Sequence, residues 1–348
     1  MQDVATRKTV SGRGPRVVTR VAVAAAIAYV IAVAAVAAGA ADAVTPRVPA
    51  PEQVTIATVQ DAGKPFALRA NVYLPAQRNG AVPLVLFLHG HGGAFDFANG
   101  APSYDHALTL PARGIAVATI SYRPHDRLPG EIHDVKGYVR WFRAHAQRFG
   151  IDPRRIGVWG TSRGGHLAAL LATTGDVATL KGDVGGNADQ SSRVQCAAIF
   201  YPLIDLLTAG YELMQRFPGR VKREDELGLV TQLVGYSGPG GIAAVREAAA
   251  RNDRASPAWP AVERARLANP LLYVTADDPP IFVAHGAEDT AVAVEQSTRL
   301  YDRYVAAGLD AKLAVWSKGT HGNVGVDIER AAVEWFVAQL GAEAPPRR

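Results

Sequence analysis

The chain has 348 residues, 48% of them hydrophobic and 20% charged, which is the composition of a globular protein with a sizeable core. Its formal net charge is +5, but five basic and only two acidic residues lie before residue 44, and no basic stripe interleaved with aromatic residues follows. The charge therefore does not indicate a nucleic-acid partner. The single cysteine, Cys196, excludes an internal disulfide, and its apolar surroundings predict a small buried core residue.

The first 43 residues differ in pattern from the rest. Several basic residues end at Arg20, and residues 21–41 then contain no charged side chain. Ala38-Gly39-Ala40 and Ala41-Asp42-Ala43 both have the small-x-small pattern of a signal-peptidase site. We therefore expect a signal peptide at 1–43 and an exported protein, periplasmic or secreted. The alternative is an uncleaved membrane anchor with the domain outside the cytoplasm, because the run is about as long as a membrane span.

The remainder is interpreted as three parts: a Pro-rich linker at 44–53, a folded domain at 54–342 and a tail at 343–348. Within the domain, residues 54–74 predict two or three strands, with a hairpin turn at 61–64. Continuous apolar runs at 83–88 and 115–120 predict buried parallel strands.

The next pattern is helical and ends at Gly150. Its apolar residues recur every three or four positions and are Ile132, Val135, Val139, Phe142, Ala146 and Phe149. Short apolar runs then predict four more strands, at 156–159, 197–201, 281–285 and 311–316. Helical patterns follow some of these strands, at 295–306 and 327–340. This alternation predicts an α/β fold with a doubly wound, mostly parallel sheet.

Residues 206–267 do not fit the alternation, because they are mostly polar and helical and stand between two predicted strands. We interpret this block as an insertion above the strand ends, where it could act as a lid. Its aromatic residues either line a substrate groove or pack a small core of the insertion; they are Tyr211, Phe217, Tyr236 and Trp259.

A nucleophile elbow is predicted at Gly160-Thr-Ser162-Arg-Gly164. The pattern G-x-S-x-G lies between the apolar run at 156–159 and an Ala- and Leu-rich helical pattern. Glycines on both sides of the serine let the strand and helix backbones approach each other without Cβ clashes. Ser162 is therefore the candidate nucleophile, and the first N–H groups of the helix point near it.

The acid and the base follow in chain order. The strand predicted at 281–285 is followed by Glu288 and Asp289, and the strand at 311–316 is followed by His321, the last histidine of the chain. Functional loops gather at the carboxyl ends of such strands. We predict that Ser162 attacks, His321 accepts its proton, and Asp289 orients the imidazole. Glu288 is the competitor for the acid role.

An oxyanion hole requires backbone N–H groups directed at the developing negative charge. One is expected from Arg163, the residue after the nucleophile, and another from the glycine-rich loop at 89–93. The two histidines of that loop, His89 and His91, have the H-x-H spacing of metal ligands, but no further ligand follows closely to complete a site. A hydrogen bond that orders the loop is the favoured role for His89.

These motifs resemble the α/β-hydrolase superfamily, and within it the hormone-sensitive-lipase-like and acetyl-xylan/feruloyl (BD-FAE-like) esterases. The similarity extends over about residues 54–340, so it is far more specific than one motif. The matching segments include the loop at 89–93 and residues 71–75, 120–123, 133–141, 150–159, 162–175, 268–280 and 285–286.

Two features depart from these esterases. Their oxyanion loop usually reads His-Gly-Gly-Gly, and here His91 interrupts it, so the donors are either His91 and Gly92, which we prefer, or Gly93 and Ala94. They also usually carry Ala after the serine, where this chain has Arg163. The Arg163 side chain is expected either to recognise an anionic or sugar-like group or to form an outward surface salt bridge.

The resemblance implies an exported serine esterase that hydrolyses short-acyl, aryl or carbohydrate-linked carboxylic esters through an acyl-enzyme, with no cofactor and no metal. Its partner would be a small-molecule or polysaccharide-linked ester, with membrane contact only through an uncleaved N-terminal segment. A serine peptidase or another acyl hydrolase on the same fold is the alternative, because the acyl-transfer chemistry is shared. A non-catalytic binding protein is a third possibility, although all three catalytic positions are filled.

Overall fold

The computed structural model describes residues 50–90, 107–124, 128–175, 177–219, 230–231 and 233–341. The chain divides into two units, Met1–Asp42 and Ala43–Arg348, and every described residue belongs to the second. The predicted signal peptide or anchor, most of the linker, the tail at 343–348 and the loop residues His91, Gly92, Gly93 and Ala94 lie outside the described residues. Within the described ranges, no helix is long and apolar enough to span a bilayer.

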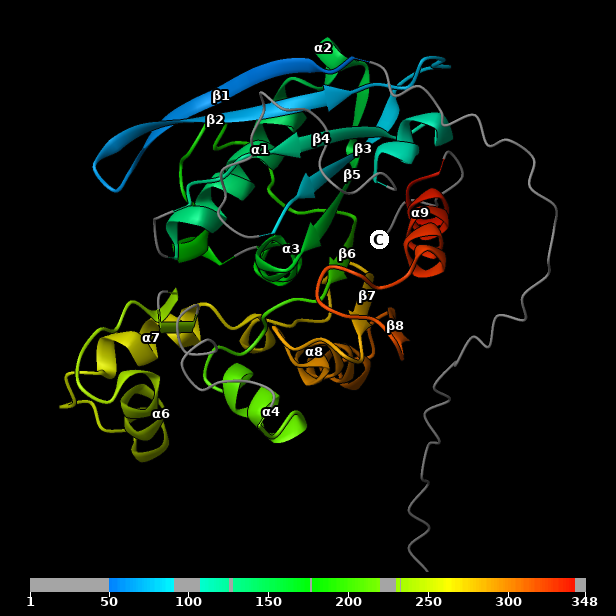
Figure 1. The fold of residues 1–348 in the computed structure, drawn as a ribbon. Coiled ribbons are helices and arrows are strands. Elements are labelled where there is room, and N and C mark those ends of the chain that lie inside the picture. Colours follow the sequence, from blue (N-terminus) through cyan, green and yellow to red (C-terminus); the bar gives the residue numbers. More distant parts are fainter. Residues whose placement is uncertain are drawn as a thin grey trace, which may run out of the picture. The chain divides into compact units, whose positions relative to one another are not determined.

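Eight strands of the described domain form one sheet, in the order β1-β2-β4-β3-β5-β6-β7-β8 (Figure 1). β2 runs antiparallel to its neighbours β1 and β4, and the other neighbouring pairs are parallel. The bounds are β1 Glu52–Asp61, β2 Lys64–Tyr73, β3 Val82–Leu88, β4 Ala116–Ile120, β5 Ile151–Thr161, β6 Cys196–Phe200, β7 Ile281–Gly286 and β8 Ala311–Trp316. The predicted mostly parallel sheet is confirmed.

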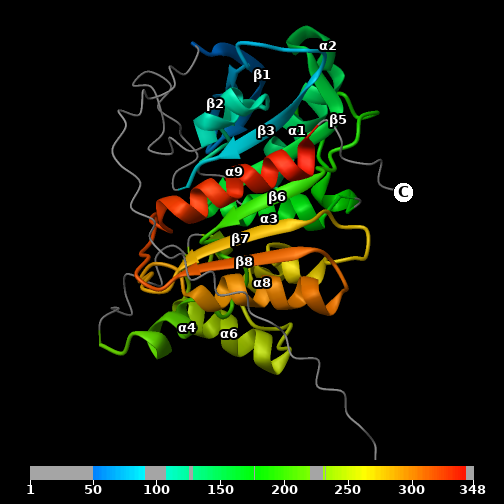
Figure 2. The same cartoon turned by 90° about the vertical axis from the view of Figure 1, so that its right-hand side faces the viewer.

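Helices cover both faces of this sheet (Figure 2). α1, α3 and α8 pack on one face, and α9 packs on the other with the 3-10 helix η1. The bounds are η1 Ala107–Arg113, α1 Gly130–Ala144, α2 Ala146–Phe149, α3 Arg163–Thr173, η2 Ala178–Leu180, η3 Pro270–Leu272, α8 Val294–Ala306 and α9 Val326–Leu340. The single helix predicted up to Gly150 is wrong in one respect, because the chain leaves helical geometry at His145 (φ −103°, ψ 19°).

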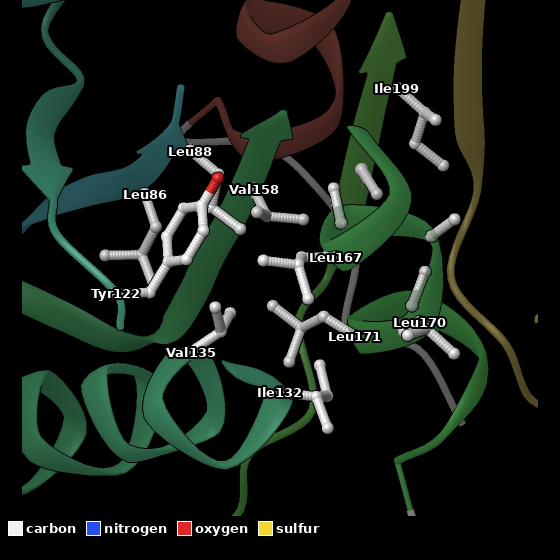
Figure 3. Close-up of a cluster of buried hydrophobic side chains, with 14 of the residues drawn as sticks. Leu86, Leu88, Tyr122, Ile132, Val135, Val158, Leu167, Leu170, Leu171 and Ile199 are labelled. Atoms are coloured by element: carbon white, nitrogen blue, oxygen red, sulfur yellow. The ribbon is translucent and has the colours of Figure 1, made fainter. Parts of the chain in front are cut away.

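The alternation of side chains along the central strands builds one core on each face. In β3, Leu84, Leu86 and Leu88 join the core beneath α1 and α3, whereas Val85 and Phe87 join the core beneath α9. Figure 3 shows part of the first core, where side chains of α1 and α3 meet those of β3, β5 and β6. Burial on both faces explains why these strands are continuous apolar runs.

The strand order also defines where a ligand is expected. The chain passes from β3 to β4 on one side and returns to place β5 on the other side of β3. Reversal of the strand order opens a crevice at the carboxyl ends of the strands, which is where open α/β sheets bind ligands. β3 and β5 meet at this reversal, so the ends of these two strands are the place to examine for chemistry.

The block at 206–267 contains three described helices, α4 Ala209–Arg216, α6 Gly241–Arg251 and α7 Trp259–Leu267. Its aromatic residues do not share one environment. Phe217 and Trp259 are buried, whereas Tyr211 is 56% exposed. Trp259 belongs to the core that α1 and α3 also share. This packing extends the main core of the domain into the insertion.

Candidate active site

The nucleophile candidate stands at a sharp turn between β5 and α3. Ser162 is the residue between them and adopts φ 51° and ψ −114°, a backbone conformation that a residue with a Cβ adopts only under strain. Its N–H donates to the carbonyl of Phe200 (2.9 Å), and its own carbonyl accepts from the N–H of His166 (3.0 Å). These two bonds hold the turn, as the elbow pattern predicted.

The glycines of the elbow are required by close backbone contacts. A Cβ on Gly160 would lie 2.1 Å from the carbonyl oxygen of Gly164, and one on Gly164 would lie 2.1 Å from the carbonyl oxygen of Leu88. The glycine-rich loop begins beside the serine, since a Cβ on Gly90 would lie 3.1 Å from the Cβ of Ser162. The ends of β3 and β5 therefore meet at the nucleophile candidate.

The three residues predicted to act together form one hydrogen-bonded series. Ser162 Oγ lies 3.0 Å from His321 Nε2, and His321 Nδ1 lies 2.8 Å from Asp289 Oδ2. Since a carboxylate only accepts, Nδ1 of His321 carries the proton and donates it to Asp289. Nε2 is then left to accept the hydroxyl proton of Ser162, which is the arrangement that general-base activation needs.

Close contact between two loops brings the acid and the base together. Asp289 follows β7 and His321 follows β8. The loops touch at Gly286 and Gly319, where a Cβ on Gly286 would lie 2.3 Å from the carbonyl carbon of Gly319. The N–H of Ala287 donates to the carbonyl of Trp316 (2.8 Å). Two parallel neighbouring strands thus deliver Asp289 and His321 to the same edge of the sheet.

Asp289 is held as a buried carboxylate. It is 1% exposed, and its Oδ1 accepts from the backbone N–H groups of Ala291 (2.8 Å) and Val292 (2.9 Å). Burial raises the pKa of this carboxyl, but hydrogen bonds from His285 and His321 outweigh the burial and hold the pKa well below its ordinary value. Asp289 is therefore ionised at neutral pH. Glu288, its competitor, is exposed.

Sequence reasoning missed two residues that surround this series. His285, fully buried at the end of β7, donates from Nε2 to the carbonyl of Val292 (2.9 Å), and the same nitrogen lies 3.3 Å from Asp289 Oδ2. The ring of Tyr201 packs edge-on against His321, with centroids 5.0 Å apart. A histidine four residues before the candidate acid was the available signal for His285. No local signal marked Tyr201, which enters the site only through the position of β6.

The oxyanion donors are partly within the described residues. Arg163 is the first residue of α3, so its N–H is among the donors that a helix start leaves without an intrahelical acceptor. His91 and Gly92 lie outside the described residues. In His89 and Gly90, which precede them, the side chain orders the backbone through one hydrogen bond: His89 Nδ1 donates to the carbonyl of Gly90 (2.8 Å). In the part of the chain that the structure describes, no cluster of three or more His, Cys, Asp or Glu is placed to hold a metal ion.

The Arg163 side chain does not form the outward surface salt bridge that was one of the two expectations. It is 7% exposed and forms a buried ion pair with Glu131 in the first turn of α1. Its Nη1 also donates to His166 Nδ1 (3.3 Å). The sequence could not indicate this pairing, since Glu131 precedes Arg163 by 32 positions and reaches it only through the packing of α1 against α3.

The family model described as BD-FAE matches residues 70–304. The chain is 29% identical over 221 residues to a probable carboxylic ester hydrolase, LipM, of Mycobacterium tuberculosis, covering 61% of this chain and 43% of LipM. It is 26% identical over 257 residues to the isoprenylcysteine alpha-carbonyl methylesterase ICME of Arabidopsis thaliana, covering 73% of this chain and 53% of ICME. The chain thus spans about half the length of these relatives.

A solved structure, a truncated carbohydrate esterase from gut microbiota, has a similar fold. Its TM-score is 0.64 at 23% sequence identity, and the match covers 83% of this chain and 96% of that one. At this identity the likeness supports the fold alone. The sheet order, the flanking helices and this neighbour agree on the α/β-hydrolase fold.

Proposed function

The chain belongs to the BD-FAE family, and we propose that it is a serine esterase that hydrolyses carboxylic esters through an acyl-enzyme. One observation carries this proposal: Ser162, His321 and Asp289 are hydrogen-bonded in series at the start of α3. The family and its esterase-named relatives favour an ester over other acyl substrates.

The first half of the proposed reaction forms the acyl-enzyme. Ser162 Oγ attacks the ester carbonyl carbon while His321 Nε2 takes the hydroxyl proton. The carbonyl oxygen becomes negative and accepts from the N–H of Arg163 and from the loop after β3, with His91 and Gly92 as the proposed donors. Collapse of this tetrahedral intermediate breaks the bond to the alcohol, which leaves with the proton that His321 had received.

The second half releases the acid. Water loses a proton to His321 Nε2 and attacks the acyl carbon, and the proton returns to Ser162 Oγ as the carboxylic acid departs. Asp289 acts as a carboxylate, because hydrogen bonds from His285 and His321 hold its pKa well below its ordinary value despite its burial. Its part is to keep Nδ1 of His321 protonated and to stabilise the imidazolium that forms in each half-reaction. These steps need no cofactor.

The substrate proposal is a short-acyl or aryl ester, including one attached to a carbohydrate. We also propose that residues 1–43 direct export, with an uncleaved anchor as the alternative. Fractionation of cells that make the full-length protein, with mass spectrometry of its N-terminus, tests this proposal: cleavage after residue 40 or 43 supports export, and an intact chain in the cytoplasm contradicts it.

Hydrolysis of a p-nitrophenyl ester series, from acetate to long acyl chains, tests the function. The Ser162→Ala protein is the matched comparison, with circular dichroism to show that both are folded. We expect turnover of the short esters and a loss of roughly 10³-fold or more in the variant. Turnover of peptide substrates without ester turnover would instead indicate a peptidase, and no turnover of either by folded protein would contradict the proposal.

A further inference from the structure

Each of the three nitrogens of the Arg163 guanidinium has a hydrogen-bond partner. Nε donates to Glu131 Oε1 (3.1 Å), Nη2 pairs with Glu131 Oε2, and Nη1 donates to His166 Nδ1 (3.3 Å). Arg163, Glu131 and His166 are all buried. A forked pair of this kind fixes the direction of the guanidinium as well as its distance.

The chain of hydrogen bonds continues to the end of the insertion. His166 Nε2 lies 2.7 Å from the carbonyl oxygen of Ala268, the residue that follows α7. A carbonyl only accepts, so Nε2 carries the proton and Nδ1 accepts from Arg163. Burial, together with the smaller effect of the positive charge of Arg163, lowers the pKa of His166 to about 3, so the ring is neutral. Donor and acceptor therefore match at each link.

A positively charged side chain is unexpected at the first residue of α3, where Arg163 lies. The start of a helix carries a partial positive charge, which disfavours arginine there, and the esterases that the chain resembles usually have alanine. Burial lowers the pKa of Arg163 to about 10, which leaves it protonated at neutral pH. Glu131 cancels the charge of Arg163, so the pair brings no net charge to the serine. The pair instead fixes the position of the first residue of α3.

Packing of α1 against α3 holds Glu131, and with it the first residue of α3, in place. Glu131 lies in the first turn of α1. Ile132 and Val135 of the same helix share one buried cluster with Leu167 and Leu171 of α3 (Figure 3). The ion pair thus joins the first residue of α3 to a helix that is already packed against the later turns of α3.

We propose that Arg163 is a positioning residue, whose guanidinium, held by Glu131 and His166, keeps its own backbone N–H directed at the developing oxyanion. The inference rests on the proposed ester hydrolysis at Ser162. A tilt of the first turn of α3 would misdirect this N–H, and it would also displace the Cα of Arg163 and break the contacts of its guanidinium to Glu131. The side chain therefore resists the motion that would weaken the oxyanion hole.

A paired substitution separates this role from a merely structural one. In the full-length protein, Arg163→Met leaves Glu131 buried without its cation, which is strongly destabilising. Adding Glu131→Met replaces the pair by apolar side chains of similar size, so the melting temperature should recover toward that of the wild type. We expect kcat for p-nitrophenyl acetate to remain about 10-fold or more below the wild type, with KM within about twofold.

Comparing an ester with its thionoester gives a ratio of rates that does not change when only the folded fraction of the protein changes. Sulfur in place of the carbonyl oxygen is larger and accepts hydrogen bonds weakly, so a well-directed N–H favours the oxygen ester more than its sulfur analogue. A smaller folded fraction lowers both rates equally. We expect the oxygen-to-sulfur ratio of kcat/KM to fall about fivefold or more in the double variant, because one oxyanion donor contributes 10²–10³-fold when fully aligned.

A conservative pair of variants covers the case in which the double variant does not fold. Arg163→Lys keeps a charge near Glu131 but loses the fork, and the oxygen-to-sulfur ratio should fall. Arg140→Lys is the matched control, because Arg140 is a fully buried arginine of α1 that donates to the carbonyls of Lys181 (2.9 Å) and Val184 (3.0 Å). Its ratio should equal that of the wild type even if its melting temperature falls.

The outcomes distinguish this inference from the proposed function. Wild-type turnover that Ser162→Ala abolishes, with a lowered ratio in the Arg163 variants alone, supports both. Wild-type turnover with an unchanged ratio in the double variant and in Arg163→Lys overturns the positioning role and leaves the esterase intact. If the wild type hydrolyses no ester, the proposed function itself has failed.

Discussion

Replacement of Asp289 by asparagine tests how the site holds the base. Oδ1 of Asp289 accepts from two backbone N–H groups, of Ala291 and Val292. In Asp289→Asn the amide oxygen should keep these two donors, so the NH2 group faces His321 Nδ1. Two donors cannot face each other, so His321 must adopt the tautomer with the proton on Nε2. That nitrogen then cannot accept from Ser162.

The expected loss of activity is large, because His321 can no longer act as the general base although the three side chains keep their positions. We predict a fall in kcat/KM of roughly 10³–10⁴-fold, which corresponds to about 4–5.5 kcal/mol of transition-state stabilisation. The assay is p-nitrophenyl acetate hydrolysis at pH 7–8, with circular dichroism to show a folded variant. Glu288→Gln makes the same change one residue earlier at an exposed position and should retain wild-type kcat/KM. A loss below tenfold in Asp289→Asn, or an equal loss in Glu288→Gln, would refute the reasoning.

Asp289 also links the site to stability. The pKa of its carboxyl is depressed in the folded state, because the hydrogen bonds of His285 and His321 outweigh the effect of burial. The ionised carboxylate therefore stabilises the folded protein at pH values above the ordinary aspartate pKa of about 3.9. This stabilisation is lost as the pH falls through the folded-state pKa. The stability gap between wild type and Asp289→Asn should therefore be widest near neutral pH. Urea titrations at several pH values measure it, and a gap that grows on acidification would contradict the assignment.

Three further predictions follow from the geometry. His285→Leu removes one of the two histidine hydrogen bonds to Asp289 and should lower kcat about 10-fold with little change in KM, as steady-state kinetics would show. Gly164→Ala places a Cβ 2.1 Å from the carbonyl oxygen of Leu88, so urea unfolding should show a loss of about 3 kcal/mol or more; an unchanged midpoint would contradict the contact. Burial raises the pKa of Asp278 to about 6, so its stabilising contribution is lost as the pH rises from about 4 through 6. Asp278→Asn should therefore gain about 2 kcal/mol relative to wild type between pH 4 and pH 8, and a constant difference would exclude this origin.

The sequence predicted the sheet well because its strands are buried on both faces. The runs at 83–88 and 281–285 needed no periodicity to be recognised as parallel strands, and the structure has β3 and β7 there. β5 was predicted too short. It begins at Ile151, which pairs with Val82, and it includes Pro153 across an irregular register. The sequence predicts a strand only at 156–159, because proline removes a ladder hydrogen bond and a local pattern does not reveal a distant pairing partner.

In the site, too, the sequence predicted what depends on local pattern and strand order, and it did not predict what depends on helix packing. Ser162, Asp289 and His321 could be placed together from the sequence, because the carboxyl ends of neighbouring parallel strands meet at one edge of a sheet. The environment of Arg163 could not be predicted, because it depends on the angle at which α1 packs against α3. Glu131 has no motif of its own, and it becomes recognisable only when packing brings it to Arg163.

The central claim is that Ser162 is the nucleophile, and covalent labelling tests it most directly. An alkyl p-nitrophenyl phosphonate forms a bond from phosphorus to an activated serine oxygen and releases p-nitrophenolate. Intact-mass and peptide mass spectrometry of the treated full-length protein should show a single adduct on Ser162 and a parallel loss of ester hydrolysis, with no adduct in Ser162→Ala. An adduct on another residue, or full ester hydrolysis by the labelled protein, would contradict the account.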